Sequence, residues 1–356
     1  MSIDIKVNRL PARTWNWLQM NESRLSQIEA KGICKVEMEG KTAETPWIKE
    51  RFDSIDSGMG GDMTRLVKQN GAAPLHLAAA AGSEETVKLH FSFADGEESG
   101  RTVDLSAEEG GRLTVIMDYT SQKNAAGLGA VQTRLRAGRN AVIRLVQLQL
   151  LGEGYTLLND IGGVCADGGE IQVLQLFLGA AKTFAGCRVE LNGSESRLMA
   201  DIGYFGRREQ MFDMNYAAIH RGKKSQSLMK ADGILKDASS KLFRQTIDFK
   251  KGASGAQGDE REEVLLLSDD AVNRSIPLIL CGEEDVKGNH GATVGRLDED
   301  LMFYLCSRGM SETDVCNMIA RARMDALCRK IGDAAAEEQL QQFFLQYEDT
   351  NSAIRI

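Results

Sequence analysis

From about residue 85 onward, hydrophobic side chains recur at every second position. Val87, Leu89, Phe91 and Phe93 alternate with polar residues, and the same period returns from Leu113 to Tyr119. Successive side chains of a strand point to opposite faces, so this period predicts strands that each bury one face. Further runs of this kind cover residues 142–150, 171–177, 187–191, 198–204, 211–217, 227–231 and 242–249. The middle of the chain is therefore expected to consist of many short strands.

Short polar turns separate these runs, among them GEG, ADGG, NGSES and FGRRE. The chain has 36 glycines and only 4 prolines, a composition that suits tight turns between strands. The pattern favours an all-β body but leaves a sandwich, a barrel and a β-helix open, since no repeat of about 20–30 residues can be read. The scarcity of Asn-Gly turns leans away from a simple hairpin meander.

Helical signals return near the end of the chain. Asp298 is an expected N-cap, with Glu299 and Asp300 in the first turn of the helix and Gly309 after its last turn. Ser311 and Asp314 resemble a capping box for a second helix, and residues 334–347 are expected to form a third.

Composition narrows the function classes. The net charge of −8 gives no reason to expect nucleic-acid binding, and no apolar run approaches the length of about 20 residues that spans a bilayer. The start of the chain lacks the pattern of a secretory signal. Seven scattered cysteines without a C-x-x-C spacing favour a reducing, cytoplasmic location over a disulfide framework. We expect these cysteines to be mainly buried small hydrophobes.

One long stretch carries a family resemblance. The residues VKGNHGATVGRLDEDLMFYLCSRGM (286–310) resemble the signature of the SufB/SufD family, the scaffold subunits of the SUF iron–sulfur cluster assembly machinery. Residues 252–286 and the N-terminal segment 7–25 are similar to the same family, the latter in its SufD branch. The resemblance implies a mainly β protein with a right-handed parallel β-helix core. It implies a non-catalytic subunit, with ATP hydrolysis in a SufC partner.

This fold divides the chain into three expected regions. Residues 1–84 form an N-terminal mixed and partly helical region, in which Trp15 and Trp17 are expected to be core or docking anchors. Residues 85–285 form the β-helix core. Residues 286–356 form a C-terminal region with a glycine-rich turn around His290, followed by the helices that dock SufC.

His290 is the first candidate site residue. The resemblance implies a role for it in cluster assembly at the interface with SufB, where it would act as a ligand for iron or for the cluster. The alternative is a turn histidine that only bonds the local backbone. Many relatives carry cysteine where this chain has Gly288, so this subunit is not expected to hold a cluster unaided. We expect no tightly bound cofactor, and iron or a cluster shared transiently with SufB.

The second candidate surface is the helix that follows. The resemblance implies that this region binds SufC, an ABC-type ATPase, and we expect Phe303, Tyr304, Leu305 and Arg308 to make the contact. The alternative is that Phe303 and Leu305 simply pack the helix onto the β body. The expected partners are therefore a SufB-like scaffold and a SufC-like ATPase, with a homodimer as a further possibility.

Two other functions are compatible with a β-helix. A polysaccharide lyase or hydrolase would cluster carboxylates along one face, for which Asp160, Asp201 and Asp213 are the candidates. A self-associating structural protein would pair through the open ends of its sheets.

Overall fold

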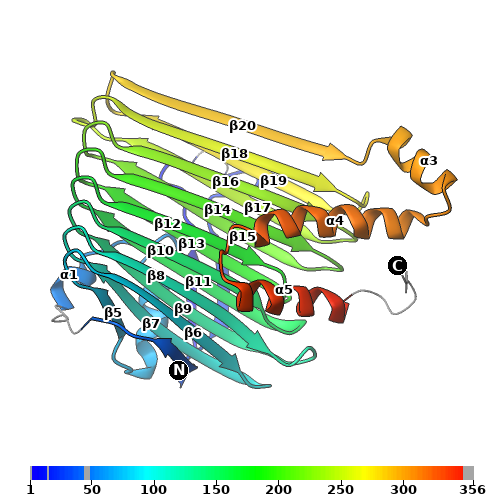
Figure 1. The fold of residues 1–356 in the computed structure, drawn as a ribbon, viewed down its shortest axis with the longest axis horizontal. Coiled ribbons are helices and arrows are strands. Elements are labelled where there is room, and N and C mark those ends of the chain that lie inside the picture. Colours follow the sequence, from blue (N-terminus) through cyan, green and yellow to red (C-terminus); the bar gives the residue numbers. More distant parts are fainter. Residues whose placement is uncertain (1, 14–15, 44–48, 348–356) are drawn as a thin grey trace.

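The computed structural model describes residues 2–13, 16–43 and 49–347. Its body is a parallel β-solenoid, in which the chain winds repeatedly between two facing sheets (Figure 1). From β3 onward, strands with even numbers lie in one sheet and those with odd numbers in the other, so each coil contributes one strand to each sheet. The predicted β-helix core flanked by other elements at both ends is confirmed.

The even sheet and the odd sheet each contain nine strands within the described part of the chain. In spatial order the even sheet is β20 (Val286–Arg296), β18 (Ala256–Leu266), β16 (Gln226–Leu235), β14 (Arg197–Gly206), β12 (Glu170–Phe177), β10 (Val142–Leu150), β8 (Arg112–Ser121), β6 (Glu84–Phe93) and β4 (Lys35–Gly40). The odd sheet is β19 (Val272–Cys281), β17 (Ser240–Phe249), β15 (Met211–His220), β13 (Lys182–Leu191), β11 (Gly154–Cys165), β9 (Ala126–Ala137), β7 (Glu97–Ala107) and β3 (Gly32–Ile33), with β5 (Leu75–Ala79) also on β7.

The strand register is regular along the solenoid. Val142 pairs with Arg112 on one side and with Glu170 on the other, so these two coils are 30 and 28 residues long. Only the first strand of the even sheet departs from parallel pairing, since β4 runs antiparallel to β6. The varying coil length explains why no fixed repeat is legible in the sequence.

The alternating hydrophobic residues face the inside of the coil. Val87, Leu89, Phe91 and Phe93 are each at most 4% exposed and belong to one continuous core between the sheets. Leu113, Val115, Met117 and Tyr119 extend that core in the next coil. Burial of these side chains stabilises the solenoid, because apolar area removed from water contributes about 25 cal/mol per Å². The period of two thus identified the inner face correctly.

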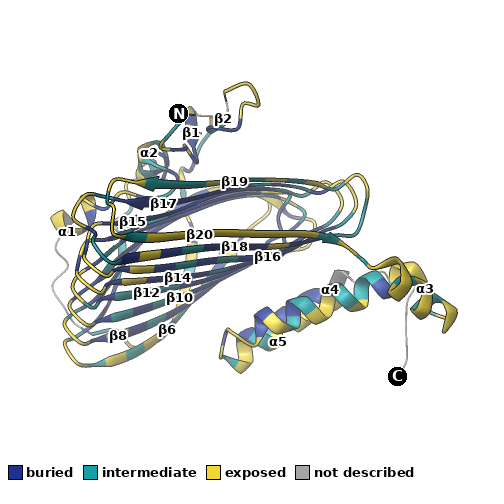
Figure 2. Ribbon diagram, turned by 90° about the horizontal axis from the view of Figure 1, so that it is seen from above, coloured by how far each residue is buried: buried dark blue, intermediate teal, exposed yellow. Residues whose placement is uncertain are grey.

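The C-terminal helices cover the outer face of the even sheet. After α3 (Glu299–Ser307) come α4 (Glu312–Cys328) and α5 (Ala334–Tyr347), which lie along that face in Figure 2. Met324, Leu327 and Leu340 pack there against Leu148 and Leu176. The predicted caps are confirmed: the Asp298 side chain accepts from the Leu301 amide, and Ser311 with Asp314 forms a capping box.

The N-terminal region covers the outer face of the odd sheet. It holds the antiparallel pair β1 (Ile3–Val7) and β2 (Ser23–Ile28), the short helices α1 (Lys49–Asp53) and α2 (Gly61–Val67), and the 3₁₀ turn η1 (Lys68–Asn70). Met63, Leu66 and Val67 of α2 pack against Leu128 and Leu158 of the sheet. Trp17 is 95% exposed, which excludes the core role predicted for it and leaves the docking role a prediction, while Trp15 lies outside the described residues.

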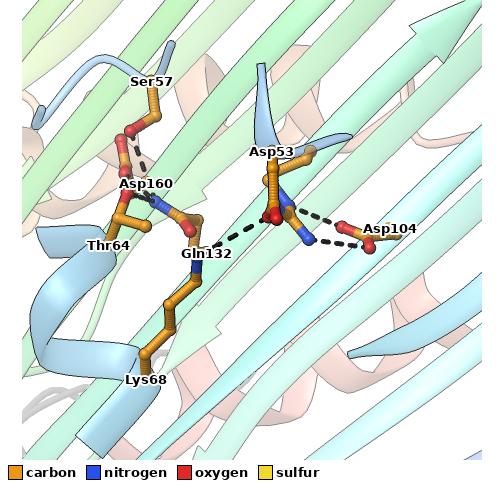
Figure 3. Close-up of polar contacts among 8 residues, drawn as sticks. Asp53, Ser57, Thr64, Lys68, Asp104, Gln132 and Asp160 are labelled. Carbon is orange, nitrogen blue, oxygen red and sulfur yellow. Dashed lines mark hydrogen bonds and ion pairs between the residues drawn. The ribbon is translucent and has the colours of Figure 1, made fainter. Parts of the chain in front are cut away.

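Buried polar contacts attach this N-terminal region to the solenoid (Figure 3). Arg134 of β9 bonds both carboxylate oxygens of Asp104 at 2.7 and 2.8 Å and reaches Asp53 at 2.9 Å. Nearby, the Gln132 amide donates to Asp160 at 2.9 Å and to Thr64 of α2 at 2.8 Å. Each buried carboxylate on the face of the sheet therefore has partners that compensate for its lost hydration.

Candidate functional site

The outer faces of the solenoid are covered by the N-terminal region and by the C-terminal helices. At the end of the solenoid that follows last in the chain, β19 and β20 are the terminal strands of their sheets and pair with no further strand within the described residues. β20 is largely exposed, with Val294 51% exposed, whereas β19 is mainly half-buried (Figure 2). A free strand edge presents unpaired backbone groups that another strand can bond. The edges of β19 and β20 are called the open end of the solenoid below.

His290 lies in the middle of this terminal strand. The predicted glycine-rich turn is wrong here, because β20 pairs in parallel with β18 over its whole length, from Val286 to Arg296. Hydrogen bonds from a neighbouring strand can override the weak strand propensity of glycine. The predicted boundary between residues 285 and 286 falls between β19 and β20, so the last coil of the solenoid straddles it.

The register places His290 directly beside Glu260. Nδ1 of His290 is 3.6 Å from Oε2 of Glu260, and the histidine side chain is 29% exposed while the glutamate side chain is fully buried. Partners in a parallel pair point to the same side of the sheet, so His290 faces the inside of the last coil. Its ring thus stands between the interior and the open end.

Gly288 is on the same inner side, two residues before His290. A Cβ atom at this position would lie 3.0 Å from Ile279 and 3.1 Å from the Phe249 ring. A larger residue therefore fits only if these side chains shift slightly. The position at which many relatives carry cysteine is thus beside the histidine and directed towards the same inner space.

Charged side chains lie inside the solenoid just below His290. Lys241 of β17 forms a fully buried ion pair with Glu262, and its ammonium also donates to the Ser275 hydroxyl at 3.0 Å. Glu260 lacks such a partner, and both of its carboxylate oxygens are buried without a hydrogen bond. Burial, followed by the nearby negative charge of Glu262, raises the pKa of Glu260 to about 8.

These groups were not identified from the sequence. The run DEREE at 259–263 looks like a solvated charged stretch, although Glu260 and Glu262 fall on the same phase as the buried Ala256, Gly258 and Val264. This alternation is the sequence signal that could have identified the two glutamates as inward-facing. Within the described residues no group of three or more histidine, cysteine, aspartate or glutamate side chains is arranged to hold a metal ion. Imidazole and carboxylate are nevertheless suitable ligands for iron.

The cysteines fit the expectation for small buried residues only in part. Cys34, Cys165, Cys187 and Cys328 are buried, and burial raises the pKa of the Cys34 thiol to about 12. A thiol with a raised pKa is a poor nucleophile at neutral pH. Cys281, at the end of β19, is exposed, whereas Cys306 and Cys316 on the C-terminal helices are half-buried.

Three of the residues predicted to contact SufC lie on α3, which extends beyond the end of the sheets, and the fourth, Arg308, is the C-cap of that helix (Figure 1). Phe303 is 77% and Tyr304 53% exposed, and no residue of this helix is fully buried. The Arg308 guanidinium lies 5.1 Å from the centre of the Tyr304 ring, a cation–π geometry. Leu305 is half-buried. The alternative packing role is therefore excluded for Phe303.

The three aspartates considered for a polysaccharide-cleaving site do not converge. Asp160 bonds Gln132 and the Met59 amide, Asp213 forms a buried ion pair with Arg244, and Asp201 bonds Lys330 of the C-terminal helical region. Each carboxylate has its own structural partners. No paired-carboxylate arrangement results from them.

Fold and site together define a class: a parallel β-solenoid with covered faces, one open end and an exposed helix beside that end. The comparison with protein families gives the particular group. The family model of the SufBD core domain, described as SUF system FeS cluster assembly, matches residues 92–323. The chain belongs to this family. Among the helices of the described residues, none combines the length and apolarity of a bilayer-crossing segment.

Curated relatives point to one branch of the family. The chain is 25% identical over 238 residues to the iron–sulfur cluster assembly protein SufD of Bacillus subtilis, an alignment that covers 66% of this chain and 54% of that protein. It is 23% identical over 299 residues to SufD of Escherichia coli, covering 82% and 68%. The chain therefore spans about half to two thirds of the length of these relatives.

Proposed function

We propose that this chain is a SufD-like scaffold subunit that supports iron–sulfur cluster assembly in the cytoplasm without catalysing a reaction of its own. The observation that carries this proposal is the match to the SufBD core over residues 92–323, together with relatives named SufD. The absence of converging carboxylates at Asp160, Asp201 and Asp213 gives no support to a sugar-cleaving function.

The partner of the open end is proposed to be a SufB-like chain. The free edges of β19 and β20 supply backbone donors and acceptors, and His290 faces the same end. In this arrangement iron or a nascent cluster is the cargo, and it is shared between His290 and thiolates of the partner, because Gly288 supplies none. A second copy of this chain is the alternative occupant of the same edges.

The α3 surface is proposed to bind a SufC-like ATPase. Phe303, Tyr304 and Arg308 combine exposed aromatic area with a cation, which are the residue types that dominate binding energy at protein interfaces. ATP hydrolysis would occur in that partner. α3 contacts α4, and α4 packs on the even sheet, so movement of α3 would be transmitted to the solenoid.

The test is the mass of the species formed when the chain is co-expressed with SufB-like and SufC-like chains. A stable complex of all three is expected, with loss of SufC when residues 298–356 are removed. A chain that remains alone in the presence of both partners would contradict the proposal. A homodimer that binds SufC and ignores SufB would retain the scaffold role and replace SufB as the partner.

A further inference from the structure

A cavity of about 710 Å³ lies where the C-terminal helices meet one edge of the solenoid. The turns that follow β10, β12, β14 and β16 form its wall, and α4 and α5 border it on the outer side of the even sheet. Small-molecule sites in proteins commonly enclose between about 300 and about 1,000 Å³. The cavity therefore has the size of a ligand site, and none of its described lining residues belongs to β19, β20 or α3.

The floor of the cavity is apolar. Phe205 near the end of β14 and Phe344 of α5 both border it, with ring centres 6.5 Å apart, and each is less than a tenth exposed. Ala320 of α4 also borders it and is 2% exposed. All three residues belong to the apolar cluster that holds the helices on the sheet. Two aromatic rings and a methyl group offer a surface on which a flat apolar molecule can pack.

Cationic side chains outnumber anionic ones around this floor. Five of the side chains that line the cavity are cationic and three are anionic, although the whole chain has a net charge of −8. One of the cations is neutralised locally, because Arg208 forms an ion pair with Glu153. Lys182 and Lys236 form no ion pair with any described residue. Two ammonium groups without a counter-charge beside a partly enclosed space attract an anion.

Arg207 joins the cationic wall to the apolar floor. Its guanidinium lies 5.2 Å from the centre of the Phe205 ring, a cation–π geometry, and donates to the Leu178 carbonyl at 3.1 Å. These contacts orient a planar group whose N–H donors match the geometry of a carboxylate or phosphate. A ligand with one apolar and one anionic end would meet a complement to each end in this cavity.

We propose that this cavity binds a small organic anion, in which a flat apolar body carries a carboxylate, sulfonate or phosphate group. The apolar body lies on Phe205 and Phe344, and the anionic group lies towards Lys182, Lys236 and Arg207. The bound molecule touches both the turns of the solenoid and the two helices, so it strengthens the attachment of the helices to the even sheet. This binding does not depend on the proposed scaffold function.

A pair of dyes tests the proposal on the purified full chain. Anilinonaphthalene sulfonate has an aromatic body with one anionic group, and phenylnaphthylamine has the same body without the charge. Fluorescence titration is expected to give one saturable site per chain, with tighter binding of the sulfonate than of the neutral dye. The double variant Lys182→Gln with Lys236→Gln should weaken sulfonate binding at least about tenfold and should change binding of the neutral dye by less than about twofold.

The matched control is Lys223→Gln with Lys251→Gln. It removes two exposed lysines from turns at the opposite edge of the solenoid, so the change in net charge is the same. This variant should bind both dyes as the unchanged chain does. A comparable loss of sulfonate affinity in the control would show that net charge, and not the cavity, determines binding.

Nuclear magnetic resonance of alanine methyl groups locates the dye on the folded chain. Nuclear Overhauser contacts are expected between the sulfonate dye and Ala320, and none with Ala137, which is buried in the core between the sheets. Full sulfonate affinity in the Lys182 and Lys236 double variant, no binding by the unchanged chain, or a dye that contacts only alanines away from the cavity would overturn the proposal. None of these results alters the mass of the complex with SufB and SufC, so the two proposals fail separately.

Discussion

His290 lies directly across from Glu260 on neighbouring parallel strands, with Nδ1 3.6 Å from Oε2. The pairing joins the largely exposed strand β20 to a carboxylate whose residue is only 1% exposed. It places His290 between the interior of the last coil and the open end. The candidate site is therefore a property of the last two coils together, and not of the loop that the glycines had indicated.

Replacing His290 by alanine is expected to leave the fold intact and to reduce cluster assembly by the complete complex. The side chain ends a sheet and fills no part of the apolar core, whereas its imidazole is the proposed ligand. Cluster formation is measured by visible circular dichroism in an anaerobic reconstitution. Asn289→Ala is the matched control, because Asn289 is adjacent on the same strand and bonds Asp259 on the opposite face. An equal yield in both variants would remove His290 from the mechanism.

The α3 surface is tested by the double variant Tyr304→Ala with Arg308→Glu. It removes an exposed ring and reverses the charge stacked on it, so affinity for a SufC-like ATPase should fall at least about tenfold. Surface plasmon resonance gives the affinity, and far-ultraviolet circular dichroism verifies the helix content. Leu345→Ala on α5, which is 50% exposed, serves as the control for an apolar surface truncation. Unchanged affinity in the double variant would exclude this surface.

Local patterns predicted much of this fold. The period of two located the inner residues of the strands, and the caps at Asp298 and Ser311 located two helices. The parallel pairing between strands about 30 residues apart was not readable, because it depends on contacts between coils whose lengths vary. For the same reason the sequence pattern did not bring Glu260 and His290 together. Residues that pair across parallel strands here lie about 30 positions apart, so no short window of the sequence contains both of them.

The buried histidine of β15 makes stability depend on pH. His220 is held between the hydroxyls of Ser225 and Ser227 at 2.8 and 2.9 Å, and burial lowers its pKa to about 4. The unfolded chain takes up a proton near pH 6.5, so its protonation favours unfolding as pH falls from 6.5 to 4. The loss attributable to this residue reaches about 3 kcal/mol at pH 4.

The measurement is urea unfolding at pH 7, 5.5 and 4 for the unchanged chain and for His220→Gln. Glutamine does not titrate, so the variant should lose less stability between pH 7 and pH 4. Both chains share every other titrating group, and the difference between them isolates the histidine. Parallel pH profiles for the two chains would contradict the assignment of the lowered pKa to His220.

Gly58 should tolerate no side chain. The loop before α2 lies so close to the odd sheet that a Cβ at Gly58 would be 2.0 Å from the Cys187 amide nitrogen, and the Gly58 amide donates to Ile161 at 3.0 Å. Gly58→Ala is therefore expected to lower the free energy of unfolding by at least about 2 kcal/mol. Gly61→Ala is the matched control, since a Cβ there meets nothing within 4 Å at the start of α2. Alanine should be neutral or stabilising at Gly61, because it favours the helix. Equal urea midpoints for the two variants would show that the loop is not held against the sheet.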